Sequence, residues 1–107
     1  MTDSYVFPER WSDLRGRDPA DERDRDRLEA ELAREVATSH PLSGLRASAI
    51  AACSHCDDVI YELPDGGYAV VHLSWPKSAP DRPPWPVHKR VADWAALMSY
   101  IDDHEDA

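Results

Sequence analysis

The sequence has little of several features that mark large classes of proteins. It contains two cysteines in 107 residues, too few for a disulfide scaffold, so we expect a soluble protein of the reducing cytoplasm. It has 12 Lys and Arg residues against 21 Asp and Glu residues, a formal net charge of −9. We therefore expect no nucleic-acid partner and no membrane partner, because both kinds of binding need positive surface to neutralise phosphates.

Long apolar runs and catalytic signatures are also absent from the sequence. No run approaches the roughly 20 apolar residues that cross a bilayer, and Met1–Arg10 lacks a basic flank followed by an apolar stretch. There is no glycine-rich phosphate loop, zincin helix or nucleophile elbow. We therefore expect a protein without catalytic residues or a cofactor.

The chain is long enough for one domain with a modest core. Residues 1–17 contain aromatic residues but no helical or strand periodicity, which predicts an irregular N-terminal arm. The arm either docks its aromatic residues on the domain or is disordered. A single small α+β domain is predicted over residues 18–107.

A charged helix is predicted after the arm. It begins at Asp18-Pro19, an acidic N-cap followed by proline at the first helical position. It ends near Ser39, because Pro41 restricts the residue before it to extended conformations. Residues 21–27 contain no apolar side chain, so the start of the helix is expected to overhang the core. The apolar residues of its second half form one stripe: Leu28, Leu32 and Val36.

A β-hairpin is the clearest unit of the sequence. Residues 58–63 and 68–75 are rich in β-branched and aromatic residues and flank Asp65-Gly66, which suits a two-residue type I′ turn. This turn pairs Leu63 with Tyr68. Both faces of the predicted hairpin are largely apolar, so helices, the arm or a second subunit must cover each of them.

The remaining segments complete a predicted three-stranded antiparallel meander. Residues 45–53 are predicted to be a strand, although their alanines also favour a helix. Five prolines between residues 75 and 88 predict an extended loop, held by Trp75 and Trp85. An amphipathic helix is predicted over residues 89–103, and we expect both helices to pack on one face of the sheet.

Cys53-Ser54-His55-Cys56 is the one motif that suggests metal chemistry. Its Cys-x₂-Cys spacing is typical of half a zinc site, and His55 lies inside it. A structural zinc needs further ligands, so other histidines would have to converge on the motif: His40, His72 or His88. A zinc site and a redox pair stay open beside the expected assignment, which is a pair of ordinary reduced cysteines.

A catalytic relay could be drawn from His72, Ser74 and the Asp57-Asp58 pair. However, His72 and Ser74 lie on one face of the predicted strand about 6–7 Å apart, which is poor geometry for a nucleophile and its base. The adjacent aspartates point to opposite faces and form no acid–base pair. We expect His72 to be a packed, hydrogen-bonded histidine.

Three short motifs stand along the second half of the chain: Asp57-Asp58-Val59, Val70-Val71-His72-Leu73-Ser74-Trp75 and Trp85-Pro86. With the hairpin between them, they resemble a pattern found in a family of short uncharacterised bacterial proteins. Ser74 stands where that family usually has threonine. The resemblance covers about residues 28–101 and implies the α+β layout, but it implies no catalytic role.

These observations favour a small acidic protein that acts through protein–protein contact, as an immunity protein or an adaptor does. An acidic surface suits a basic partner. The candidate binding surface consists of Tyr61, Glu62, Tyr68, His72, Trp75 and Trp85. Two alternatives remain: a zinc- or thiol-dependent protein centred on Cys53 and Cys56, and a structural homodimer that uses a sheet face.

Overall fold

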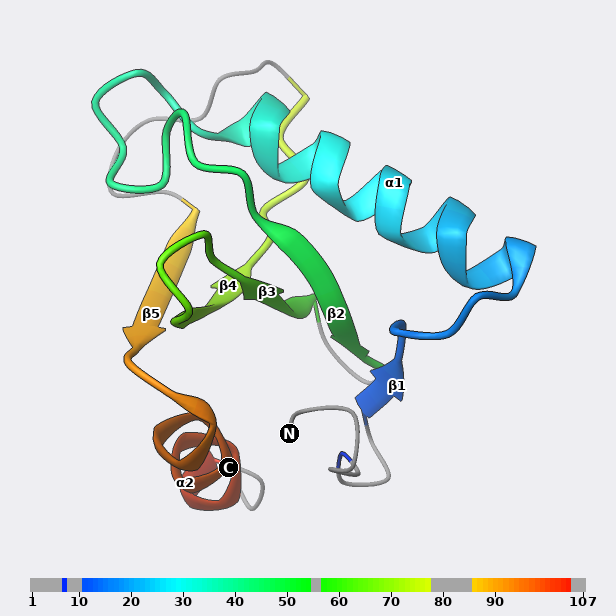
Figure 1. Cartoon of the computed structure of the whole chain (residues 1–107). Coiled ribbons are helices and arrows are strands. Elements are labelled where there is room, and N and C mark those ends of the chain that lie inside the picture. The colour runs from blue at the N-terminus through cyan, green and yellow to red at the C-terminus, as the bar shows by residue number, and fades with distance from the viewer. Residues whose placement is uncertain (1–6, 8–10, 55–56, 78–85, 105–107) are drawn as a thin grey trace.

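The computed structural model describes residues 7, 11–54, 57–77 and 86–104. These residues form a five-stranded antiparallel sheet and two helices (Figure 1). The strands lie side by side in chain order: β1 (Trp11–Asp13), β2 (Ser48–Cys53), β3 (Asp58–Glu62), β4 (Tyr68–His72) and β5 (Val87–Val91). The helices are α1 (Pro19–Glu35) and α2 (Trp94–His104). The α+β class is confirmed, whereas the prediction of three strands is wrong.

The two additional strands lie at the edges of the sheet. β1 falls in the predicted irregular arm, where three residues are too few to show a periodicity. β5 falls at the start of the predicted C-terminal helix. That helix begins only at Trp94, because the Asp93 side chain caps it by accepting a hydrogen bond from the Ala96 N–H at 2.8 Å.

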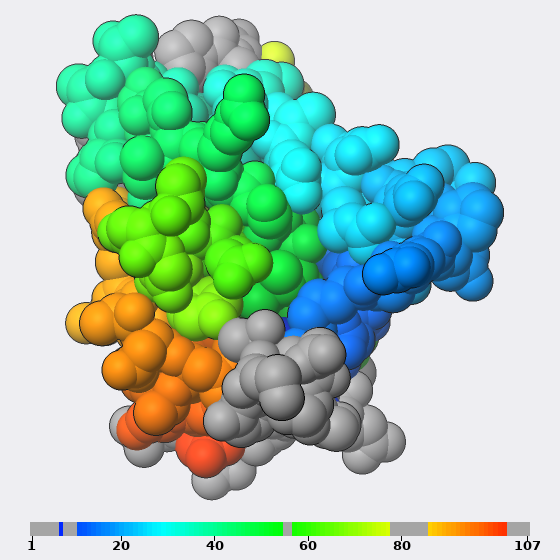
Figure 2. Space-filling model, viewed as in Figure 1, coloured from blue at the N-terminus to red at the C-terminus, as the bar shows by residue number. Residues whose placement is uncertain are grey.

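The start of α1 is as predicted. Asp18 accepts a hydrogen bond from the Ala20 N–H at 3.0 Å, and proline follows it at the first helical position. Arg25 donates to the carbonyl oxygens of Leu14 and Gly16, which ties the helix to the chain that follows β1. Figure 2 shows the first half of α1, in light blue, projecting beyond the body of the molecule. The helix ends at Glu35 rather than near Ser39.

The hairpin of β3 and β4 has a different register from the predicted one. Its strands pair Glu62 with Tyr68, and its loop is a three-residue turn in which Gly66 has a φ of 89°. The Gly66 N–H donates to the Leu63 carbonyl at 3.0 Å. A two-residue turn would need an N–H on Pro64, which proline lacks, so the chain adopts the longer loop. This shift changes which residues face each other across the strands.

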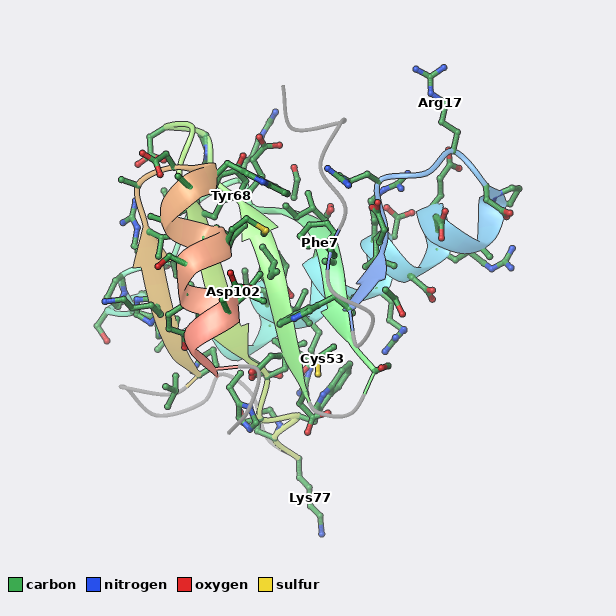
Figure 3. All side chains as sticks on the ribbon, turned by 90° about the horizontal axis from the view of Figure 1, so that it is seen from below. Phe7, Arg17, Cys53, Tyr68, Lys77 and Asp102 are labelled. Atoms are coloured by element: carbon green, nitrogen blue, oxygen red, sulfur yellow. The ribbon has the colours of Figure 1, made fainter. Side chains whose placement is uncertain are left out.

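Both faces of the sheet are apolar, and a helix of the same chain covers each one. The α1 side buries these residues: Leu14, Leu28, Leu32, Leu42, Ala49, Val59, Tyr61, Leu63, Ala69, Val71 and Leu73. The α2 side buries these: Phe7, Trp11, Ile50, Ala51, Cys53, Ile60, Tyr68, Val70, Trp94, Leu97 and Ile101. Figure 3 shows Phe7 and Tyr68 on the α2 side. Successive side chains of β3 and β4 point to opposite faces of the sheet, and the buried ones on both faces are apolar. Each face therefore needs a helix, and the expectation that both helices pack on one face is wrong.

The predicted homodimer that uses a sheet face stays a prediction. Within the described ranges, neither apolar face of the sheet lacks a helix. No helix in that part of the chain has the length and apolar character needed to cross a membrane.

Candidate functional site

The last residue of α1 places a buried carboxylate beside the end of β4. Glu35 is fully buried at 0% exposure. One carboxylate oxygen accepts hydrogen bonds from the Ser74 N–H at 2.9 Å and the Ser74 hydroxyl at 3.0 Å. The other accepts a hydrogen bond from the Trp75 N–H at 3.0 Å. Two successive backbone N–H groups thus point at one anionic group, which fixes the segment after β4 to α1.

Glu35 shares its environment with Glu31, one turn earlier on α1. Arg34 donates two hydrogen bonds to the Glu31 carboxylate at 2.9 and 2.8 Å, and they lower the pKa of Glu31. Burial raises the pKa of Glu35, and its hydrogen bond with Glu31 raises it further. The pair therefore has two separated pKa values, with that of Glu35 raised and that of Glu31 lowered, so a proton that binds to the pair binds to Glu35 first.

Trp75 has a strained backbone and an exposed ring. Its φ is 48°, in the left-handed region that bulky residues rarely adopt. The residue is 41% exposed, and the guanidinium carbon of Arg27 lies 5.6 Å from the centroid of its ring. This distance is within the range of a cation–π contact. Glu35 thus holds the backbone in a costly conformation at a residue whose aromatic ring faces solvent.

Trp75→Gly is expected to be more stable than Trp75→Ala by about 1 kcal/mol, because glycine adopts a positive φ without the steric cost of a Cβ atom. Neither variant has the indole ring, so the comparison isolates the backbone. Urea unfolding of the two proteins measures the difference. Equal free energies of unfolding would contradict a left-handed conformation at residue 75.

A hollow of ≈ 230 Å³ opens beside Trp75 at the end of the sheet. We call it the Trp75 hollow, and its lining residues are Arg27, Leu28, Ala52, Cys53, Asp57, Asp58, Val59, Leu73 and Trp75. Sites for drug-sized ligands usually enclose about 300–1,000 Å³. The Trp75 hollow is smaller, so its size suits one side chain better than a whole cofactor.

Two residues of the predicted binding surface belong to this end of the sheet. Trp75 lines the hollow. His72 is exposed, and its Nδ1 lies 2.8 Å from Oδ1 of Asp58, another lining residue. Glu62 is also exposed, but it lies at the opposite end of β3. Trp75 and His72 therefore both lie near this end of the sheet, and Glu62 lies at the other end of β3.

Tyr61 and Tyr68, also predicted for the surface, are instead buried at 0% and 3% exposure. The register places Tyr61 under α1, where its hydroxyl donates to the Leu28 carbonyl at 2.7 Å. Burial raises the pKa of that hydroxyl. Tyr68 lies under α2, with its ring centroid 5.6 Å from that of Trp94. Trp85 lies outside the described residues.

The predicted metal motif is only partly described, because His55 and Cys56 lie outside the described residues. Cys53 is buried on the α2 side of the sheet. Across the described ranges, no three His, Cys, Asp or Glu side chains gather in a way that could hold a metal ion. The zinc and redox assignments of this motif stay predictions.

Two of the histidines considered as further zinc ligands lie together elsewhere. The ring of His40 is buried, 4.9 Å between centroids from the ring of His88. The Nε2 atom of His40 lies 3.0 Å from the Pro86 carbonyl, and its Nδ1 atom accepts a hydrogen bond from the Leu42 N–H. Both ring nitrogens of His40 thus lie within hydrogen-bond distance of backbone groups. His88 is on β5, so β3 and β4 separate it from Cys53 on β2.

Glu35 and Arg27 are site residues that the sequence analysis missed. One signal for Glu35 is present in the sequence, because it lies on the same helical stripe as Leu28 and Leu32. A glutamate on the buried stripe of a helix needs hydrogen-bond partners, so its position indicates a polar contact inside the domain. Arg27 carries no such signal, because it is one of several arginines on the exposed half of α1.

No family model, curated protein or solved structure matches the chain. The resemblance to short bacterial proteins stays a prediction based on the three motifs quoted for it. Function is therefore argued from the chemistry of the site.

Proposed function

We propose that the protein is a non-enzymatic binding module, immunity- or adaptor-like, that docks a protein partner on the surface around Trp75. The observation that carries this proposal is an exposed indole ring on a strained backbone that the buried Glu35 holds in place. Tryptophan and arginine are enriched among residues that dominate binding energy at protein interfaces, and Arg27 lies over the Trp75 ring. The net charge of −9 supports a basic partner.

The Glu31 and Glu35 pair supports a positioning role rather than acid–base catalysis. Neighbouring carboxyl groups with separated pKa values also occur in catalytic sites. Here, however, Glu35 is fully buried, and its oxygens accept hydrogen bonds from the backbone of Ser74 and Trp75. A substrate cannot reach a carboxylate that is enclosed in this way, so the pair serves to orient the Trp75 segment.

Affinity capture from an extract of the source cells tests the proposal. The wild-type protein is expected to retain a partner at low salt, and rising salt is expected to weaken the retention. Trp75→Gly removes the ring without backbone strain and is expected to reduce retention by at least about 10-fold, as loss of a dominant interface residue does.

Leu45→Ala provides a matched control, because Leu45 is 38% exposed and Trp75 is 41% exposed. This variant is expected to retain the partner as the wild type does. Equal losses in the Trp75 and Leu45 variants, or the absence of any partner, would contradict docking at Trp75. Retention that does not change with salt would contradict a basic partner.

A further inference from the structure

We propose that the Trp75 hollow binds one cationic side chain of the docked protein, an arginine in preference to a lysine. This inference rests on the proposed function and adds the chemistry of its central contact. It follows from the charges, the aromatic wall and the apolar floor that line the hollow.

The hollow offers a carboxylate that is available to a ligand. Asp57 is exposed, and none of the residues that the structure describes pairs with its side chain. The neighbouring Asp58 is half-buried, and its Oδ1 atom lies 2.8 Å from His72. An unpaired carboxylate beside a hollow favours a cation, and a guanidinium can form two parallel hydrogen bonds with it.

The aromatic wall suits the same group. Arg27 already lies over the Trp75 ring, with its guanidinium carbon 5.6 Å from the ring centroid. The ring therefore accepts a guanidinium in this structure, and arginine makes such contacts more often than lysine. Leu28, Val59 and Leu73 form an apolar part of the lining, against which the methylene groups of a long basic side chain can pack.

Two other hollows among the described residues lack this combination. The hollow of ≈ 430 Å³ between α1 and the chain before β2 is mainly apolar, and the carboxylate of Glu29 in its wall accepts a hydrogen bond from the Ala49 N–H at 2.9 Å. In the hollow of ≈ 280 Å³ beside the β3–β4 turn, Arg90 and Asp65 pair with each other at 3.0 Å. In both places the charges already have partners.

N-acetyl-arginine methylamide is a suitable probe, because the guanidinium is its only charge. Titration of the ¹⁵N-labelled full chain, followed by NMR at the Trp75 indole N–H, is expected to give a saturable shift. N-acetyl-alanine methylamide is expected to give none. Asp57→Asn is expected to weaken probe binding by about fivefold, whereas Arg27→Gln is expected to strengthen it by about twofold, because it removes a competing cation.

Asp102→Asn provides the matched control, because it makes the same change in net charge at an exposed site on α2. It is expected to leave probe affinity unchanged within about twofold. The dispersion of each variant's NMR spectrum verifies that the variant is folded.

Three results would overturn the inference. These are the absence of a saturable shift at Trp75, equal effects of the Asp57 and Asp102 variants, and tighter binding of N-acetyl-glutamate methylamide that Arg27→Gln abolishes. The last result would identify an anion site instead. Partner capture that still depends on Trp75 would then leave the proposed function intact, so the two failures can be distinguished.

Discussion

Glu35→Ala is expected to lower the free energy of unfolding by about 2–4 kcal/mol, because it removes a charged acceptor and leaves a small cavity. The N–H groups of Ser74 and Trp75 both lose their acceptor, and the Ser74 hydroxyl loses one as well. Chemical denaturation measures the loss. A domain of this size has a total stability of about 5–15 kcal/mol, so the effect is a large fraction of it.

Glu35→Gln is the control, because its amide oxygen can still accept a hydrogen bond. It is expected to cost about 1 kcal/mol. If the alanine and glutamine variants lost the same amount, the hydrogen bonds to Ser74 and Trp75 would not be the source of the stability.

The difference in stability between the wild type and Glu35→Gln is also expected to depend on pH. Burial raises the pKa of Glu35 above its ordinary value of 4.5. A raised folded-state pKa means that its contribution is fully present below pH 4.5 and is lost as the pH rises through the folded-state value. The lowered pKa of Glu31 acts in the opposite direction, and its largest cause, the hydrogen bonds from Arg34, is common to both proteins. Glutamine does not titrate, so the advantage of the wild type over Glu35→Gln is expected to shrink as the pH rises.

Leu97→Ala is expected to lower the free energy of unfolding by about 2–5 kcal/mol, because Leu97 fills the centre of the contact between α2 and the sheet. Leu97 is fully buried at 0% exposure and belongs to the same cluster as Ile60 and Val70. Ser99→Ala, an exposed change on the same helix, is expected to stay within about 0.5 kcal/mol of the wild type. Similar small losses in urea unfolding for both variants would contradict the packing of α2 on the sheet.

The features that could be predicted from the sequence are set by neighbouring residues. The start of α1 follows from Asp18-Pro19, because a cap and its proline act within one turn. The central hairpin follows from two segments rich in β-branched and aromatic residues and a glycine turn, and its two apolar faces correctly require cover on both sides. The preference of Asp65-Gly66 for a two-residue turn predicts the wrong register, because Pro64 lacks the N–H that this turn needs.

The features that could not be predicted depend on contacts between distant parts of the chain. β1 is a strand because it pairs with β2, with all of α1 between them in the sequence. The candidate site also depends on a contact between distant parts of the chain. Trp75 could be named from its residue type, but the role of Glu35 appears only when the end of α1 meets the end of β4.

The chain-order arrangement of the strands has a consequence for the kinetics of folding. From β2 to β5, each strand pairs with the next one along the chain, so this part of the sheet forms through contacts of short sequence separation. Such topologies fold fast for their size. β1 is the exception, since its pairing with β2 closes a loop of about forty residues at a larger entropic cost. We therefore expect the β3–β4 hairpin to form early in folding and β1 to pair with β2 late.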